Sequence, residues 1–204
     1  FYTYGYGYYK QYKDQRTLLE YMNMGIGDAS VEADMIRRKI MRNHTAGVNG
    51  SFTYTSPRLT LLLGGSYLYY TCPHWGELDW VDGFGEAHIA GRWYDNDVLK
   101  QDANIFARAD WTVLRGFVDN ELHIFGDLQY RYVHYKAWGT NDNAIWGDEG
   151  VVMQPIDVDE RYNFFNPRVG ISYIHHRHNI FGSVAVAHRE PTRSDFTDRY
   201  MFTS

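Results

Sequence analysis

Side chains in residues 121–133 alternate between two chemically different faces. The first face is apolar and contains Leu122, Ile124, Gly126, Leu128, Tyr130 and Tyr132, whereas the second is polar and contains Glu121, His123, Asp127, Gln129 and Arg131. Because successive side chains of a β-strand point in opposite directions, one face suits lipid and the other suits water. The pattern predicts an all-β fold, with this segment as one strand of an antiparallel transmembrane β-barrel.

A second segment, residues 104–113, repeats the pattern. Its apolar row is Ile105, Ala107, Ala109, Trp111 and Val113, and its other row is Asn104, Phe106, Arg108, Asp110 and Thr112, in which only Phe106 is apolar. Slipping a strand by one residue exchanges its faces, and a basic side chain turned toward lipid near the midplane costs about 2–4 kcal/mol. We therefore predict lipid-facing positions at Leu122, Ile124, Leu128, Tyr130 and Trp111, and lumen-facing positions at Arg108, Asp110, Asp127, Gln129 and Arg131.

The same alternation predicts about seven strands in the whole chain. They lie near residues 1–9, 43–55, 59–71, 104–114, 121–137, 164–174 and 179–190. The predicted connections are short at residues 56–58, 115–120 and 175–178, and long at residues 10–42, 72–103 and 138–163. Short periplasmic turns and long outer loops are typical of bacterial outer-membrane barrels. Seven strands leave two unpaired edges, which lipid cannot satisfy, so we expect further strands outside this chain.

Average composition alone would indicate a soluble protein, because the mean hydropathy of the 204 residues is −0.50. A barrel strand, however, exposes only alternate residues to lipid, and the 18 Tyr and 6 Trp suit the membrane interface. No stretch approaches the roughly 20 apolar residues of a spanning helix. The net charge of −5 with no basic block argues against a nucleic-acid partner. The alternative at this point is a soluble β-sandwich rich in core aromatics.

Three segments also resemble a known protein family in their amino-acid sequence. They are Phe-Gly-Asp-Leu-Gln-Tyr-Arg-Tyr-Val-His-Tyr at 125–135, Tyr-Asn-Phe-Phe-Asn-Pro-Arg-Val-Gly-Ile-Ser-Tyr at 162–173, and Ala-Val-Ala-His-Arg-Glu-Pro-Thr-Arg-Ser-Asp-Phe-Thr-Asp at 185–198. The chain resembles the barrel of TonB-dependent outer-membrane receptors, especially those of Bacteroidetes. The Asn-Pro-Arg-Val-Gly and Arg-Glu-Pro-Thr-Arg stretches are the most specific parts of this resemblance.

The resemblance implies a location and a function. Receptors of this family have plugged barrels of about 22 strands, so residues 1–204 would be a partial barrel domain without the plug and the C-terminal strands. Such receptors import a bulky scarce nutrient, such as an iron–siderophore, haem or cobalamin, across the bacterial outer membrane. The implied partners are outer-membrane lipid, a TonB-type energy transducer reached through the missing plug, a small-molecule ligand and a surface lipoprotein.

The predicted loop at residues 72–103 holds the candidate ligand-binding side chains. These are His74, Trp75, Trp80, His88, Trp93 and Tyr94. Their rings can cap a pocket and stack on a flat or apolar ligand, or they can pack on one another to hold the loop together. The two interpretations stay open.

No catalytic, metal or cofactor site is expected. The three histidines in residues 175–178 sit in a predicted turn, where a solvated role is favoured over metal binding. There is no His-Glu-x-x-His, Cys-x-x-Cys, Walker or calcium-loop motif, and no Gly-x-Ser-x-Gly elbow. The functional hypotheses are therefore an importer, a structural or interaction subunit of an outer-membrane complex, and a soluble carbohydrate-binding β-sandwich.

Overall fold

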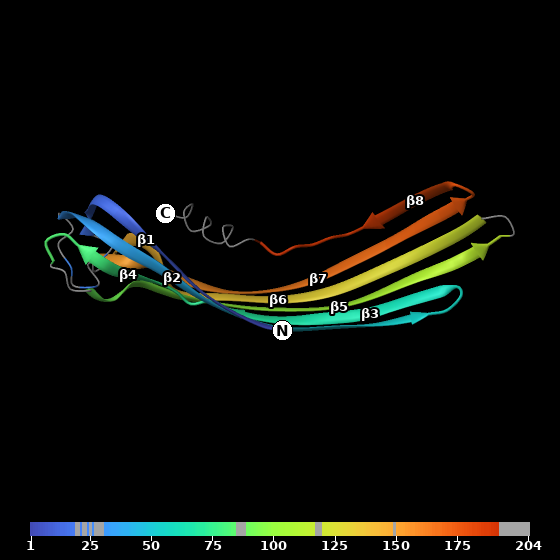
Figure 1. The fold of residues 1–204 in the computed structure, drawn as a ribbon, viewed down its shortest axis with the longest axis horizontal. Helices are drawn as coiled ribbons and strands as arrows, with labels where there is room; N and C mark the ends of the chain where they lie inside the picture. Colours follow the sequence, from blue (N-terminus) through green and yellow to red (C-terminus); the bar gives the residue numbers. More distant parts are fainter. Residues whose placement is uncertain are drawn as a thin grey trace. The chain divides into compact units, whose positions relative to one another are not determined.

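The computed structural model describes residues 1–18, 21, 24, 26, 31–84, 89–116, 120–148 and 150–191. Strands account for most of this chain, and no α-helix occurs among these residues (Figure 1). The eight strands are β1 (Tyr2–Thr17), β2 (Glu32–Thr55), β3 (Leu59–Thr71), β4 (His74–Val81), β5 (Ile89–Arg115), β6 (Asn120–Gly147), β7 (Gly150–His175) and β8 (His178–Ala185). Within the described ranges, no helix has the length and apolarity to cross a membrane.

The strands form an antiparallel meander. Their hydrogen-bonded order is β1-β2-β3-β5-β6-β7-β8, and β4 pairs with β2 and β5. β4 follows β3 after Cys72 and Pro73 and pairs with the same two strands, and the path runs to β1 at one end and to β8 at the other. The predicted all-β, antiparallel β-barrel class is confirmed, whereas the membrane location and the total number of strands stay predictions.

The predicted short turns are confirmed. β2 ends at Thr55 and β3 begins at Leu59, and the Ser56 amide donates to the Leu59 carbonyl at 2.8 Å. β5 ends at Arg115 and β6 begins at Asn120, and the Gly116 amide donates to the Asn120 carbonyl at 2.8 Å. The β7–β8 hairpin has a two-residue turn at positions 176 and 177, in which His176 adopts a positive φ of 53°.

The predicted long loops are wrong, because most of their residues belong to strands. β2 begins at Glu32 instead of residue 43, and β5 begins at Ile89 instead of residue 104. β6 ends at Gly147 instead of residue 137, and β7 begins at Gly150 instead of residue 164. β4 was not predicted at all. The reason is visible in the registers, where Arg37 faces Leu78 and Arg38 faces Glu77. Polar side chains occupy both faces here, so the alternation that marks a lipid-facing strand is lost.

The chain divides into two compact units. Unit 1 comprises residues 1–47, 68–101 and 134–160, and unit 2 comprises residues 48–67, 102–133 and 161–204. Among the described residues, every buried hydrophobic residue except Val133 belongs to unit 1. The main core of unit 1 is built from Leu18, Tyr21, Ile26, Ala33, Met35, Leu78, Val81, Trp93, Tyr94 and Met153.

Unit 2 instead exposes large apolar side chains. They include Ile105 (65% exposed), Trp111 (53%), Leu128 (43%) and Val169 (57%). On the other face of unit 2, the Phe106 ring occupies the space that a side chain at position 64 would fill. A Cβ on Gly64 would lie only 2.5 Å from this ring. This packing accounts for Phe106 as the single apolar residue in its otherwise polar row.

Candidate functional site

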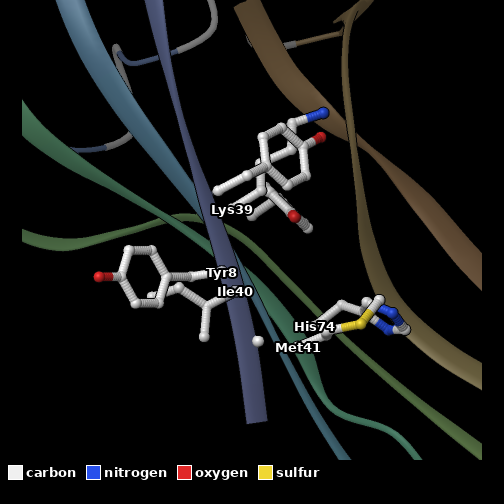
Figure 2. A pocket seen from close by; sticks show the side chains of 8 residues that line it. Tyr8, Lys39, Ile40, Met41 and His74 are labelled. Atoms are coloured by element: carbon white, nitrogen blue, oxygen red, sulfur yellow. The ribbon is translucent and has the colours of Figure 1, made fainter.

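A cavity of about 400 Å³ lies in unit 1, and we take it as the candidate functional site (Figure 2). Four strands supply its walls: β1, β2, β4 and β5. The lining residues are Gly7, Tyr8, Tyr9, Lys39, Ile40, Met41, His74 and Tyr94. A concave, mostly apolar space with a few convergent polar groups is the usual form of a small-molecule site.

The cavity exists because a glycine faces a long flexible side chain across two strands. Gly7 of β1 pairs with Met41 of β2, and Tyr9 pairs with Lys39. A Cβ on Gly7 would approach only the Met41 Cγ, at 3.8 Å, so there is open room above this position. Because the next inward-facing residue on β1 is Tyr9, its phenol ring forms a wall beside this room.

The cationic end of the cavity is Lys39. Its ammonium group pairs with the carboxylate of Asp142 and lies 5.7 Å from the centre of the Trp93 ring and 6.0 Å from that of Tyr94. The charge is therefore held both by an anion and by the faces of two aromatic rings. This arrangement fixes the ammonium group at the wall of the cavity.

The opposite end of the cavity carries sulfur and imidazole groups. Met41 pairs with His74 across β2 and β4, and Figure 2 shows the Met41 sulfur beside the His74 ring. The Cys72 Sγ lies 3.5 Å from the His74 Nε2, and its thiol donates to the side-chain carbonyl of Asn43. The Asn43 amide nitrogen lies 3.9 Å from the Met41 sulfur. Cys72 itself is buried, with 1% of its surface exposed.

A charged network covers part of the unit 1 surface next to the cavity. The indole nitrogen of Trp75 donates to Glu77 at 2.8 Å, and the guanidinium groups of Arg42 and Arg92 lie 5.5 and 4.5 Å from the Trp75 ring. Arg38 forms ion pairs with Glu77 and Asp79, at 2.8 and 3.2 Å. The network explains why Trp75 is buried even though its neighbours are charged.

The structure brings only some of the predicted ligand-binding residues to the cavity. His74 and Tyr94 line it, from β4 and β5, and their contact with a ligand stays a prediction. Trp93 is fully buried in the core of unit 1, and Trp75 is also buried. Trp80 is half-buried in β4. The placement of these side chains in an outer loop is wrong, because they belong to strands; His88 lies outside the described residues.

Sequence reasoning missed six lining residues: Gly7, Tyr8, Tyr9, Lys39, Ile40 and Met41. The three from β2 fall in the segment predicted as a loop, and the three from β1 were interpreted only as part of a strand. The alternation of tyrosine with glycine in residues 4–7 was the available signal, since a glycine on one face leaves space for the partner strand's side chain.

Four of the predicted lumen-facing residues of unit 2, Arg108, Asp110, Gln129 and Arg131, form polar contacts. Arg131 is bidentate to the Asp102 carboxylate, with Nε at 3.0 Å from Oδ1 and the second nitrogen at 2.5 Å from Oδ2. Arg108 pairs with Asp110 at 2.8 Å, and Gln129 accepts from Asn166 at 3.2 Å.

The predicted lipid-facing positions lie on the other side of the same strands. Ile124, Leu128, Tyr130 and Trp111 are exposed and Leu122 is half-buried. The phenol of Tyr130 donates to the Asn163 side chain at 2.6 Å. Exposure of this row agrees with the predicted facing, which stays a prediction because exposure alone does not identify the solvent.

The three histidines of residues 175–178 lie at the β7–β8 hairpin. His175 and His176 contact each other edge-on, with ring centres 4.5 Å apart. Across the described parts of the chain, no group of three or more His, Cys, Asp and Glu side chains is placed to hold a metal ion.

A search of protein-family models, of curated proteins and of solved structures found no match to this chain.

Proposed function

We propose that this chain is part of a bacterial outer-membrane β-barrel receptor that binds and imports a bulky, scarce nutrient. The observation that carries the proposal is the exposed apolar row of unit 2, opposite a row of ion-paired polar side chains on the same strands. In water, a surface of this kind would be an unprotected hydrophobic patch. In a bilayer, it is the outer wall of a barrel.

The dimensions of unit 2 support this placement. Its portions of β5 and β6 cover residues 102–115 and 120–133. A tilted transmembrane strand needs about 9–11 residues to cross the hydrocarbon. Each portion is therefore long enough to span the bilayer and to reach the interface at both sides.

Ligand binding is the part of the proposal that unit 1 supports. β2, β3, β5, β6 and β7 each have residues in both units, and unit 1 contains the larger buried core and the 400 Å³ cavity. The nutrient class rests on the resemblance to TonB-dependent receptors. An iron–siderophore, haem or cobalamin would contact this region together with a plug domain, and a TonB-type protein would supply the energy.

Membrane placement is tested with a matched pair of single cysteines. In a Cys72→Ser background, Leu128→Cys and Gln129→Cys each receive a fluorophore, and the protein is inserted into vesicles containing brominated lipids. We expect quenching at position 128 and much weaker quenching at position 129, because adjacent side chains point to opposite faces. Equal quenching at the two positions contradicts the proposed wall.

Import is tested in cells that lack the gene. We expect lost uptake of one labelled nutrient among iron–siderophore, haem and cobalamin, restored by the wild-type gene and stopped by dissipating the proton gradient. Unchanged uptake of all three contradicts the import proposal. A barrel that passes the quenching test and fails this one would be a structural subunit of an outer-membrane complex.

A further inference from the structure

We propose that Met41, Cys72 and His74 form a binding site for a soft monovalent metal ion, Cu⁺ or one of like chemistry. Met41 of β2 and His74 of β4 line the unit 1 cavity, and the thiol of Cys72, in the link after β3, lies 3.5 Å from the His74 ring. This inference goes beyond the proposed import function and does not depend on it.

The distance between two of the donors fits a shared metal ion. The Cys72 Sγ and the His74 Nε2 are 3.5 Å apart. In tetrahedral zinc sites, for comparison, a thiolate sulfur at about 2.3 Å and an imidazole nitrogen at about 2.0 Å from the ion are separated by about 3.5 Å. The pair therefore needs little rearrangement to hold an ion.

The third donor is positioned by backbone pairing and by a shared amide. Met41 is the direct β-ladder partner of His74, so both side chains stand on the same face. The Asn43 amide contacts both sulfurs, with its nitrogen 3.9 Å from Met41 and its oxygen accepting from Cys72. The Tyr70 hydroxyl donates to the same oxygen at 3.1 Å and holds the amide in place. Asn43 and Tyr70 are thus positioning residues.

The composition of the donor set selects the metal. A thiolate, a thioether and an imidazole are the ligands that soft ions such as Cu⁺ prefer, whereas Mg²⁺ and Ca²⁺ prefer oxygen. No carboxylate belongs to the set. Binding releases the Cys72 proton to solvent, and the thiolate then bonds to the metal in place of its hydrogen bond to Asn43.

Two of the three donors border the cavity. Met41 is 41% exposed and lines the cavity together with His74, whereas Cys72 is 1% exposed. An ion in the cavity therefore contacts the thioether and imidazole groups directly, and the Cys72 thiol lies 3.5 Å from that imidazole.

The test is a titration of the full-length protein in detergent micelles with Cu⁺ supplied as its bathocuproine disulfonate complex under anaerobic conditions. We expect one ion to bind per chain. Cys72→Ser should abolish binding, and Met41→Leu and His74→Gln should each weaken it at least about tenfold. X-ray absorption should report two sulfur donors and one nitrogen donor in the wild type, and one sulfur in Met41→Leu.

Two variants in the same unit serve as controls. Met153→Leu and His44→Gln remove one methionine and one histidine outside the site, and the affinity should change by less than about twofold. Circular dichroism checks that every variant is folded. Unchanged affinity in folded Met41→Leu and His74→Gln would overturn the proposal in favour of a lone thiol, and tighter binding of Zn²⁺ than of Cu⁺ would overturn the assignment to a soft monovalent ion.

Discussion

The same strand is patterned differently in the two units, and β2 displays the contrast within 24 residues. On its even-numbered face, Phe52 and Tyr54 of unit 2 are exposed apolar side chains. On the same face in unit 1, Arg38 is ion-paired to Glu77 and Arg42 lies over the Trp75 ring. One continuous backbone ladder thus carries a surface suited to lipid and a surface suited to water.

The two units also differ in what holds them together. Unit 1 buries its own core, in which the Trp93 ring contacts Tyr21 and Tyr94 edge-on at 5.4 and 4.5 Å. Among the described residues of unit 2, Val133 is the one buried hydrophobic residue. Without a core of comparable size, unit 2 depends on its strand pairing and on whatever covers its apolar face. The comparison therefore predicts that lipid stabilises unit 2 far more than unit 1.

The largest effect is expected from placing a charge on the apolar row of unit 2. Leu128→Arg should destabilise the inserted protein by about 2–4 kcal/mol if position 128 lies near the bilayer midplane. Gln129→Arg adds the same charge to the polar face of the same strand and should cost much less. The measurement is the urea midpoint of unfolding from lipid vesicles.

Val152→Arg supplies the matching control from unit 1. Val152 is 45% exposed, so its replacement by arginine should change the free energy of unfolding by less than about 1 kcal/mol. If Val152→Arg or Gln129→Arg proved as costly as Leu128→Arg, the contrast between a lipid-facing and a water-facing surface would fail.

The next effect tests the dry core of unit 1. A Cβ on Gly76 would lie 2.2 Å from the Trp93 Nε1 and 2.5 Å from the Tyr94 ring, and both rings are buried. Because the Trp93 ring is fully enclosed in the core, Gly76→Ala should destabilise the protein by about 1–3 kcal/mol. Thermal unfolding in detergent measures this loss.

Gly7→Ala is the matched control for that substitution. Its new methyl group would meet only the Met41 side chain, at 3.8 Å, which is ordinary contact. Alanine in a strand is also favoured over glycine by roughly 0.5–1 kcal/mol. A Gly76→Ala protein as stable as Gly7→Ala would show that the unit 1 core is loosely packed.

The strands that could be predicted from the sequence are those with one apolar face and one polar face. Leu128 and Trp111 fall in alternating rows because lipid-facing and lumen-facing positions need opposite chemistry, and that alternation also located the turn at residues 56–58. In unit 1 both faces of β2 carry arginine or lysine, at Arg37, Arg38 and Lys39. The periodicity then disappears although the strand continues, so β4 and the first half of β2 were missed.

The candidate site was less predictable because it depends on pairing between strands. Nothing in the sequence around Gly7 indicates that Met41 lies opposite to it, or that His74 pairs with Met41. The same holds for Trp93, whose burial follows from the absence of a side chain at Gly76 on the neighbouring strand. Composition identified the aromatic residues of this region, but only the register separates a cavity wall from a core residue.

The smallest effect is a pH dependence on the exposed surface of unit 1. The Tyr12 hydroxyl donates to the Asp34 carboxylate, and this hydrogen bond is the main reason that the pKa of Tyr12 is raised from 10.0 to about 12 and that the pKa of Asp34 is lowered. The Gln15 amide donates to the same carboxylate at 3.0 Å and lowers the Asp34 pKa further. Both side chains of this hydrogen bond can exchange protons with water, because they lie at the surface of unit 1.

The sign of the effect follows from these two pKa shifts. The contribution of Asp34 is complete above its ordinary pKa and disappears as the pH falls through its lowered folded-state pKa, whereas that of Tyr12 is complete below pH 10 and disappears as the pH rises through about 12. Asp34→Asn should therefore return the Tyr12 pKa toward 10, as followed by NMR of ring-labelled tyrosine with Tyr12→Phe identifying the signal. Asp79→Asn removes another unit 1 carboxylate and should leave the Tyr12 pKa near 12. A Tyr12 pKa that did not move in Asp34→Asn would show that this hydrogen bond does not form in solution.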